Sequence, residues 1–322
     1  MIALMLAASL VGAGCAEDSN QSADESPGGD SGDKGALAMS FPTNDVSVWN
    51  DQLEIMRTLI EDAGYEFLTD NPAWDIQTQV SDWEAWVARG NVKAIMGFPV
   101  QADSMVAVTA QAAAAGIPVI GYAGGWEGTA HHLELDLLGA GQKVGEAAGA
   151  WINETYGDEP VEVGLLADTT ADLGRVQAQG IREGLAAAGS NVTIYEIEAS
   201  SREQGYQGAQ STLVAHPEVK VWLGIGADMV LGARQAAIDA GAAPDDPNYY
   251  VSASDSAEEL YELIASGVDM LREAYVFAPQ VLAETNAGLL IAAAEGNLGP
   301  EESTLVGVTH VTKENAADFL SQ

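Results

Sequence analysis

The chain has 322 residues, enough for two domains of ordinary size, and 47% of them are hydrophobic, enough to form cores. Its 48 Asp and Glu residues outnumber 12 Lys and Arg residues, which gives a formal net charge of −36. Such a chain repels nucleic-acid phosphates and anionic lipid, so its charge argues against nucleic-acid binding and indicates a solvated acidic surface.

The N-terminal segment predicts an export signal. Residues 1–11 are apolar and uncharged, and small residues lead to Cys15, the single cysteine of the chain. This arrangement resembles the lipobox of bacterial lipoproteins, although Gly12 stands where leucine is usual and no basic residue precedes it. We therefore expect residues 1–15 to be a signal peptide that ends at a lipidated Cys15; a free buried cysteine is the alternative. Residues 16–35 have no aromatic or branched aliphatic residue, which predicts a disordered acidic tether.

The rest of the chain alternates apolar runs with helix-periodic segments, in two rounds. This alternation predicts parallel βαβ units and an α/β fold of two doubly wound, Rossmann-like lobes. The expected strands are 36–40, 65–68, 92–98, 118–122, 133–136, 161–166, 192–197, 219–225, 249–253, 273–277 and one near 304–309. The expected helices are 49–63, 76–88, 102–115, 138–156, 173–188, 206–216, 229–240, 258–266 and 279–295.

The stretch AAGIPVIGYAGG, residues 114–125, illustrates the unit. A helix end is followed by a short apolar strand and then by a glycine turn. Because loops at the carboxyl ends of parallel strands face the ligand crevice, Tyr122 and Trp126 are candidate crevice residues.

Five segments carry a more specific resemblance. They are GYEFLTDNPAWDIQTQVSDWEAWVARGNVKAIMGFPVQADSM (64–105), AGIPVIGY (115–122), GIREGL (180–185), AHPEVKVWLGIGADMVLGA (215–233) and ASDSAEELYELIASG (253–267). In this order and spacing they resemble the type I periplasmic binding proteins of the ribose and galactose class, the solute receptors of ABC importers. The resemblance implies two lobes joined by three crossovers, with ligand between them. The expected N-terminal lobe is 36–135 plus about 278–303, and the expected C-terminal lobe is 136–277 plus about 304–322.

In the first lobe, the resemblance implies that ligand-contacting residues lie in the loop before the first helix and at the start of that helix. The family stacks sugars on aromatic rings, so Trp49 is a candidate stacking residue, with a core residue at the helix cap as the alternative. Asn44 and Asp45 are candidates either to contact ligand or to cap that helix. The Asp-Arg pair usual after AGIPVI is replaced by Ala123 and Gly124, which argues against a ribose-like sugar.

In the second lobe, the resemblance implies five further candidates. Arg175 is one of few basic residues and is expected in a strand-end loop; a surface ion pair is its alternative. Asp255 matches the family's sheet-end aspartate, with a cap for the helix at Ala257 as the alternative. Phe277 falls where a glutamine is common. Gln177 and Asp228 occupy or adjoin positions at which the family carries arginine and asparagine.

Other patterns carry no chemistry of their own. The run from Gly139 to Gly145 mimics a dinucleotide fingerprint but lacks the strand and acidic residue of that motif, so we interpret it as small residues that pack a helix close to a sheet. The histidines do not have metal-ligand spacing, and no nucleophile elbow or P-loop is present. The sequence therefore predicts no enzyme, cofactor or metal.

The predicted function is that of an extracytoplasmic receptor. It would be a monomer, lipid-anchored to the cell membrane, that captures a small sugar-like ligand and delivers it to an ABC permease in the membrane. The alternatives are a sensor that presents ligand occupancy to a membrane receptor, or a binder of a non-sugar metabolite.

Overall fold

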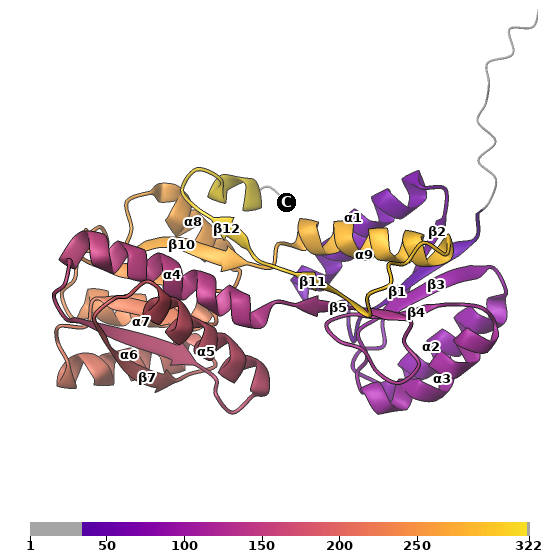
Figure 1. Ribbon diagram of the computed structural model, residues 1–322, viewed down its shortest axis with the longest axis horizontal. Helices are drawn as coiled ribbons and strands as arrows, with labels where there is room; N and C mark the ends of the chain where they lie inside the picture. Colours follow the sequence, from indigo (N-terminus) through magenta and orange to yellow (C-terminus); the bar gives the residue numbers. More distant parts are fainter. Residues whose placement is uncertain (1–33, 321–322) are drawn as a thin grey trace, which may run out of the picture. The chain divides into compact units, whose positions relative to one another are not determined.

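The computed structural model describes residues 34–320, so Cys15 and most of the predicted tether lie outside the described residues. Within this range the chain forms two sheets, each of six strands, with helices on both faces (Figure 1). The predicted fold class, two doubly wound α/β lobes, is confirmed.

The first sheet has the strand order β11-β5-β4-β3-β1-β2, and all its pairings are parallel. One face is covered by α1 and α9 and the other by α2 and α3 (Figure 1). Its elements are β1 (Ala36–Ser40), α1 (Ser47–Asp62), β2 (Glu66–Thr69), α2 (Ile76–Arg89), β3 (Val92–Gly97), α3 (Ala102–Ala114), β4 (Val119–Gly121), β5 (His131–Leu135), α9 (Pro279–Ala294) and β11 (Ser303–Val306).

The second sheet repeats this design with the order β12-β10-β9-β8-β6-β7, in which only β12 runs antiparallel. One face is covered by α4 and α5 and the other by α6, α7 and α8. Its elements are α4 (Leu137–Tyr156), β6 (Val161–Ala167), α5 (Asp172–Ala187), β7 (Val192–Glu198), α6 (Arg202–Ala215), β8 (Val221–Gly224), α7 (Ala227–Asp239), β9 (Tyr250–Ala253), α8 (Glu258–Ser266), β10 (Leu271–Val276), β12 (Thr309–Val311) and the 3-10 helix η1 (Ala316–Phe319).

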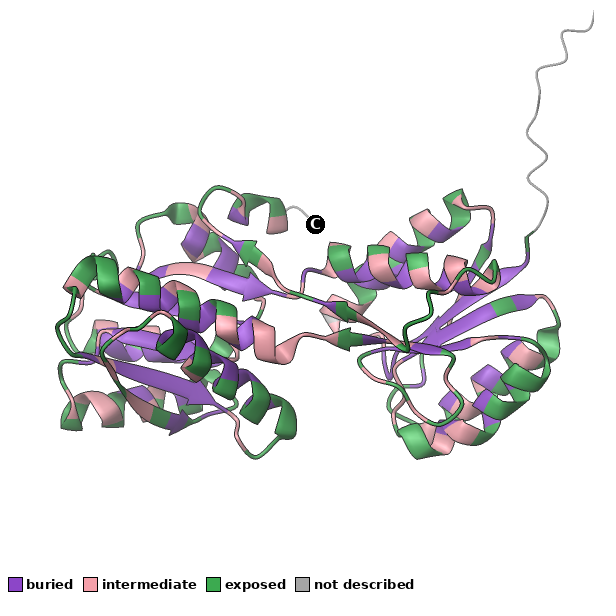
Figure 2. Cartoon of the chain, viewed as in Figure 1, coloured by how far each residue is buried: buried purple, intermediate pink, exposed green. Residues whose placement is uncertain are grey.

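The strands are apolar on both sides because helices cover both faces of each sheet. Every residue of β1, β4, β8 and β9 is buried, whereas exposed residues gather on the outer helix faces (Figure 2). Continuous apolar runs rather than alternating ones are what two covered faces require. This pattern explains why the predicted strands coincide closely with the observed ones.

The chain passes between the sheets three times, after β5, after β10 and after β11. The sequence predicted one final strand near 304–309, and this prediction is wrong because the region forms two strands. Residues 303–306 form β11 in the first sheet and residues 309–311 form β12 in the second, with Gly307 and Val308 between them. β11 therefore belongs to the first sheet, and the chain crosses to the second sheet after Val306.

The glycine run at the start of α4 packs a helix against another helix, not against a sheet as its sequence suggested. A Cβ at Gly141 would lie 2.0 Å from the backbone oxygen of Gln177 on α5, and one at Gly145 would lie 2.2 Å from that of Ile181. The two backbones approach so closely that no side chain fits between them. The small residues are thus explained by packing.

Replacing Gly141 with alanine should destabilise the protein by about 1–3 kcal/mol, because overpacking forces two backbones apart. The matched control is Gly288→Ala on the exposed side of α9, where a Cβ meets nothing within 4 Å. That change should stabilise the fold by about 0.5–1 kcal/mol, since alanine is the better helix former. Thermal unfolding of both variants measures the difference, and equal melting temperatures would contradict the close contact.

Candidate functional site

The topology of each sheet marks one edge as the place for a ligand. In both sheets the strand order reverses beside the first strand of the lobe, between β1 and β3 and between β6 and β8. Ligands of open α/β sheets bind outside the carboxyl ends of the strands at such a reversal. The loops to consider are therefore those that follow β1 and β3 in the first lobe and β6 and β8 in the second.

In the first lobe, the loops after β1 and β2 are tied together by side chains. The Asn44 amide group donates to the backbone oxygen of Asp70 (3.2 Å), and the Asn44 backbone N–H donates to the Asn71 side chain (3.1 Å). Neither Asn44 nor Asp45 caps α1, whose N-cap is Val46 with no side-chain cap bond. Asn44 instead fixes one loop to the other, and the Asn44 Oδ1 atom is buried without a hydrogen-bond partner among the described residues.

These loops carry a group of rings that we call the aromatic cluster. Trp49 stacks parallel to Phe41, with centroids 5.4 Å apart and 1° between the planes. Phe98 meets the Trp49 ring edge to face (5.6 Å), and Trp74 is tilted against it (5.8 Å). Tyr122 closes the group by contacting Phe41 at 5.1 Å and Phe98 at 5.7 Å. The cluster consists of Phe41, Trp49, Trp74, Phe98 and Tyr122.

Tyr122 and Trp126, predicted together from one turn, lie on different faces of the sheet. Tyr122 is buried in the core under α1 and α9, where the Gln52 amide donates to its hydroxyl (3.4 Å), and burial raises its pKa to about 12. Trp126 packs against the α2 and α3 side, and its indole N–H donates to Thr109 (2.9 Å). The two rings therefore do not line one pocket.

Asp70, which sequence reasoning did not single out, is the most perturbed acid of this edge. It follows β2 directly and accepts a hydrogen bond from the Ser40 hydroxyl (2.9 Å). Burial raises the pKa of Asp70 to about 7; the Ser40 bond opposes the rise and the charge of Asp82 adds to it. Its position immediately after a predicted strand was the available sequence signal.

In the second lobe, Arg175 and Gln177 lie on the first turns of α5, which follows β6. The Arg175 guanidinium donates to the backbone oxygens of Thr169 (2.8 Å) and Thr170 (3.3 Å) and forms an ion pair with Asp172. Gln177 is buried and its amide donates to the Ser254 hydroxyl (3.3 Å). Arg175 therefore lies on α5 and not in the strand-end loop where the sequence placed it. Its side chain is held by two backbone oxygens of that loop and by a surface ion pair with Asp172.

The two predicted aspartates lie at the N-terminus of α7. Asp228 is exposed in the first turn of α7 and pairs with Arg202 (3.2 Å). Asp255 accepts the backbone N–H of Ala227 (3.0 Å) and of Ser256 (2.8 Å), so it holds the start of α7 and does not cap α8. Burial of the carboxylate raises the pKa of Asp255, and the two N–H groups partly offset this effect.

Phe277 lies in the second crossover, between β10 and α9. It is half-buried and packs against the core of the first lobe, the core that also contains Tyr122. Of the predicted residues, Trp49 and Tyr122 are thus in one cluster, Phe277 packs on the same core, and Gln177, Asp228 and Asp255 gather around the ends of β8 and β9.

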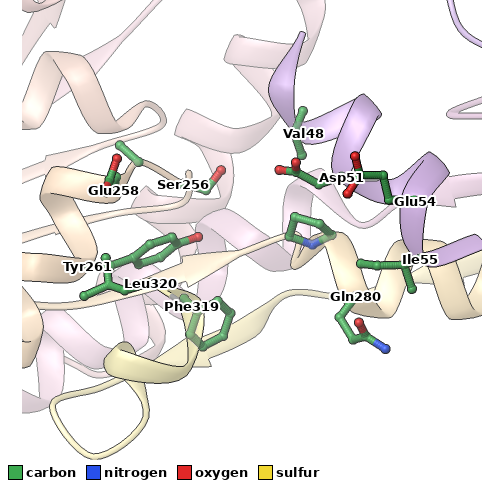
Figure 3. Close-up of a pocket in the computed structure, with 12 residues that line it drawn as sticks. Val48, Asp51, Glu54, Ile55, Ser256, Glu258, Tyr261, Gln280, Phe319 and Leu320 are labelled. Atoms are coloured by element: carbon green, nitrogen blue, oxygen red, sulfur yellow. The ribbon is translucent and has the colours of Figure 1, made fainter. Parts of the chain in front are cut away.

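A cavity of about 560 Å³ flanks these loops (Figure 3). In Figure 3, Asp51 and Glu54 of α1 lie on one side and Glu258 and Tyr261 of α8 on the other, with Phe319 beside Tyr261. Burial and the charge of Glu54 raise the pKa of Asp51. None of the predicted ligand-binding residues lines this cavity, which borders the strand-end loops through the neighbours of Trp49 and Asp255.

The sequence of the two lobes identifies the family. A family model described as a periplasmic binding protein domain matches residues 37–298, well over half of the chain. The chain belongs to this family. No curated protein matches the sequence of this binding protein.

Solved structures share the fold of this binding protein at low sequence identity. A periplasmic ribose ABC transporter protein from Conexibacter woesei has a TM-score of 0.73 at 17% identity, over 92% of this chain and 97% of that one. A solute-binding protein from Mycobacterium smegmatis with bound glycerol has a TM-score of 0.65 at 23% identity, over 89% and 97%. One from Bacillus halodurans with bound myo-inositol has a TM-score of 0.66 at 19% identity, over 91% and 99%.

Among residues 34–320, no group of three or more His, Cys, Asp or Glu side chains is arranged to hold a metal ion. No helix in the same range is long and apolar enough to cross a membrane.

Proposed function

We propose that this binding protein captures a small neutral sugar or cyclic polyol between its two lobes and delivers it to an ABC permease. The observation that carries the proposal is the aromatic cluster at the carboxyl edge of the first sheet, next to the reversal of strand order. Aromatic faces suit the apolar C–H faces of sugars and cyclitols, and ligand sites are apolar clefts with a few placed polar groups.

The polar groups at this edge support a neutral ligand. Ala123 and Gly124 stand where an Asp-Arg pair is usual in the resembling sugar binders, so no charged clamp comes from that loop. Arg175 is engaged by two backbone oxygens and Asp172 within its own lobe. The solved structures of similar fold include a ribose transporter protein and proteins with bound glycerol and myo-inositol, and these three compounds are uncharged and rich in hydroxyl groups. We assign Asn44, Asp45, Trp49, Arg175, Asp228 and Asp255 to ligand contact or to the support of contacting groups.

The proposal extends to the membrane. We propose that the protein acts outside the cytoplasm as a monomer, held at the membrane by a lipid on Cys15, and that it catalyses no reaction. Support comes from the family and from the lipobox-like sequence before Cys15. Closure of two lobes around a ligand requires no covalent chemistry from the protein.

A thermal-shift measurement tests the function. The full-length chain with Cys15→Ser is purified and heated with D-ribose, D-allose, myo-inositol and glycerol, and with glutamate and inorganic phosphate as anionic controls. A ligand that binds only the folded state stabilises it by mass action and so raises the melting temperature. At a ligand concentration of 100 times the Kd, the free energy of unfolding increases by about 2.7 kcal/mol. A shift with a neutral sugar or polyol supports the proposal, whereas a shift only with an anion contradicts it.

A further inference from the structure

The backbone at the carboxyl edge of the first sheet is strained at three positions. Ala73 (φ 51°), Trp74 (φ 63°) and Ala123 (φ 56°) are the non-glycine residues with left-handed φ among those the structure describes. All three lie in loops that follow β2 or β4, at the edge where the aromatic cluster lies. Strain of this kind persists only where the surrounding structure imposes it, and it concentrates at ligand sites.

The loop that carries Trp74 is fixed from both sides. The Trp74 backbone N–H donates to the Pro42 oxygen in the loop after β1 (2.8 Å). On its other side Asp75 caps α2 by accepting the Thr78 N–H (2.7 Å). These bonds, together with those of Asn44 to Asp70 and Asn71, hold two successive residues in a conformation that neither side chain favours.

The indole held in this way is exposed. Trp74 has 57% of its surface accessible, although it belongs to a cluster in which Phe41 is 1% and Tyr122 is 5% exposed. Trp49 is half-buried, because one of its faces lies flat against Phe41 and Phe98 meets it at an angle of 87°. The cluster therefore grades from buried rings to one ring that is open to solvent, and that ring is Trp74.

The second lobe exposes apolar side chains at the corresponding edge. Leu173 (63% exposed) and Val176 (38% exposed) lie three residues apart on α5, which follows β6 at the reversal of strand order. Residues three apart share one side of a helix. Arg175 between them is turned to acceptors of its own lobe.

We propose that Trp74 is the ring on which the ligand stacks and that Trp49 is a positioning residue behind it. This inference rests on the proposed function and narrows its ligand class to a neutral ring compound with an exposed C–H face. Asp45 lies in the loop after β1 and Asp75 directly follows Trp74, and both are exposed, so the loops of this edge carry negative charge that disfavours a carboxylate or phosphate on the ligand. Leu173 and Val176 supply the apolar wall from the second lobe.

The test compares three variants of the full-length Cys15→Ser chain. Trp74→Gly removes the ring and relieves the left-handed strain, because glycine adopts positive φ without cost. Trp74→Phe retains an aromatic ring. Trp151→Phe on α4, where Trp151 packs against Tyr156 and Tyr250, changes the same residue type remote from the loops. Titration calorimetry gives Kd for D-ribose, D-allose and myo-inositol, and acrylamide quenching of tryptophan emission is measured with and without each probe.

The expected results separate stacking from stability. Trp74→Gly should melt without ligand at or above the temperature of its parent, yet bind the recognised probe about ten-fold or more weakly. Trp74→Phe should recover most of the affinity, and Trp151→Phe should bind within about two-fold of the parent. The bound probe should shield a tryptophan of the parent from acrylamide, and this protection should be lost in Trp74→Phe.

Two outcomes overturn the inference, and they can be told apart. Unchanged affinity in Trp74→Gly, or unchanged quenching of the parent on binding, shows that another group holds the ligand while the receptor function stands. If the parent binds none of the three probes, the proposed function fails and the inference fails with it. Should Trp74→Gly not fold, the quenching of the parent and of Trp74→Phe still decides between shielding and no shielding.

Discussion

Replacing Asp70 with asparagine is expected to stabilise the protein at pH 8 by up to about 4 kcal/mol, because the folded state raises the pKa of this carboxyl from an ordinary 3.8 to about 7. The folded state therefore keeps a proton that the unfolded state loses between pH 4 and pH 7. The stability of the parent should fall as the pH rises through this window, and the full penalty is present above pH 7. Asparagine carries no charge and can still accept the Ser40 hydroxyl.

The measurement is chemical denaturation of both proteins at pH 4.5 and pH 8. The control is Asp103→Asn, an exposed aspartate in the first turn of α3, which should change stability by less than about 0.5 kcal/mol at either pH. A stability difference between Asp70→Asn and the parent that is the same at both pH values would show that the carboxylate is not destabilised by burial.

Replacing Arg234 with methionine is expected to cost about 3–5 kcal/mol, because it leaves a buried carboxylate without its partner. The guanidinium of Arg234 on α7 binds both oxygens of Asp269, with Nε donating to Oδ1 at 2.8 Å. The side chains are 13% and 5% exposed, so little water can replace the lost partner. Asp269 Oδ1 also accepts the Leu271 N–H (2.9 Å), which keeps the carboxylate in place after the substitution.

Arg202→Met is the matched control for Arg234→Met. Arg202 on α6 pairs with Asp228 (3.2 Å) and Glu259 (2.6 Å), but its side chain is 47% exposed. Ion pairs in contact with water contribute about 0–1 kcal/mol, so this change should be small. Similar losses in the two variants, measured by urea denaturation, would contradict the difference in burial.

The sequence predicted the fold well because the physical signals were local. Two covered sheet faces produce uninterrupted apolar strands, and turn residues mark their ends, so most elements were placed within two or three residues of their observed bounds. The exception, β11 and β12, shows the limit. Two short strands separated by Gly307 and Val308 look like one run, and periodicity does not reveal that the chain changes sheet between them.

The site was predicted less completely, because it depends on contacts between loops. Trp49 was predicted as a site residue, but Trp74 was not. Trp74 is exposed and has a left-handed backbone, and no glycine in the sequence marks this conformation. Tyr122 and Trp126 are four residues apart in sequence and yet lie on opposite faces of the sheet. Asp255 was expected at a sheet end, but its bond to the start of α7 rather than α8 could not be read from its neighbours in sequence.

The threefold passage of the chain between sheets has a consequence for synthesis. The first sheet receives β1 to β5 early, but α9 and β11 are made only after the whole second round of strands and helices. At a translation rate of roughly 5–20 residues per second, the interval from residue 135 to residue 294 lasts on the order of 8–30 s. During that time the face later covered by α9, which includes Leu37, Met39 and Ile120, is without its partner helix. The core face of the nascent first lobe therefore stays open until the second lobe has been made.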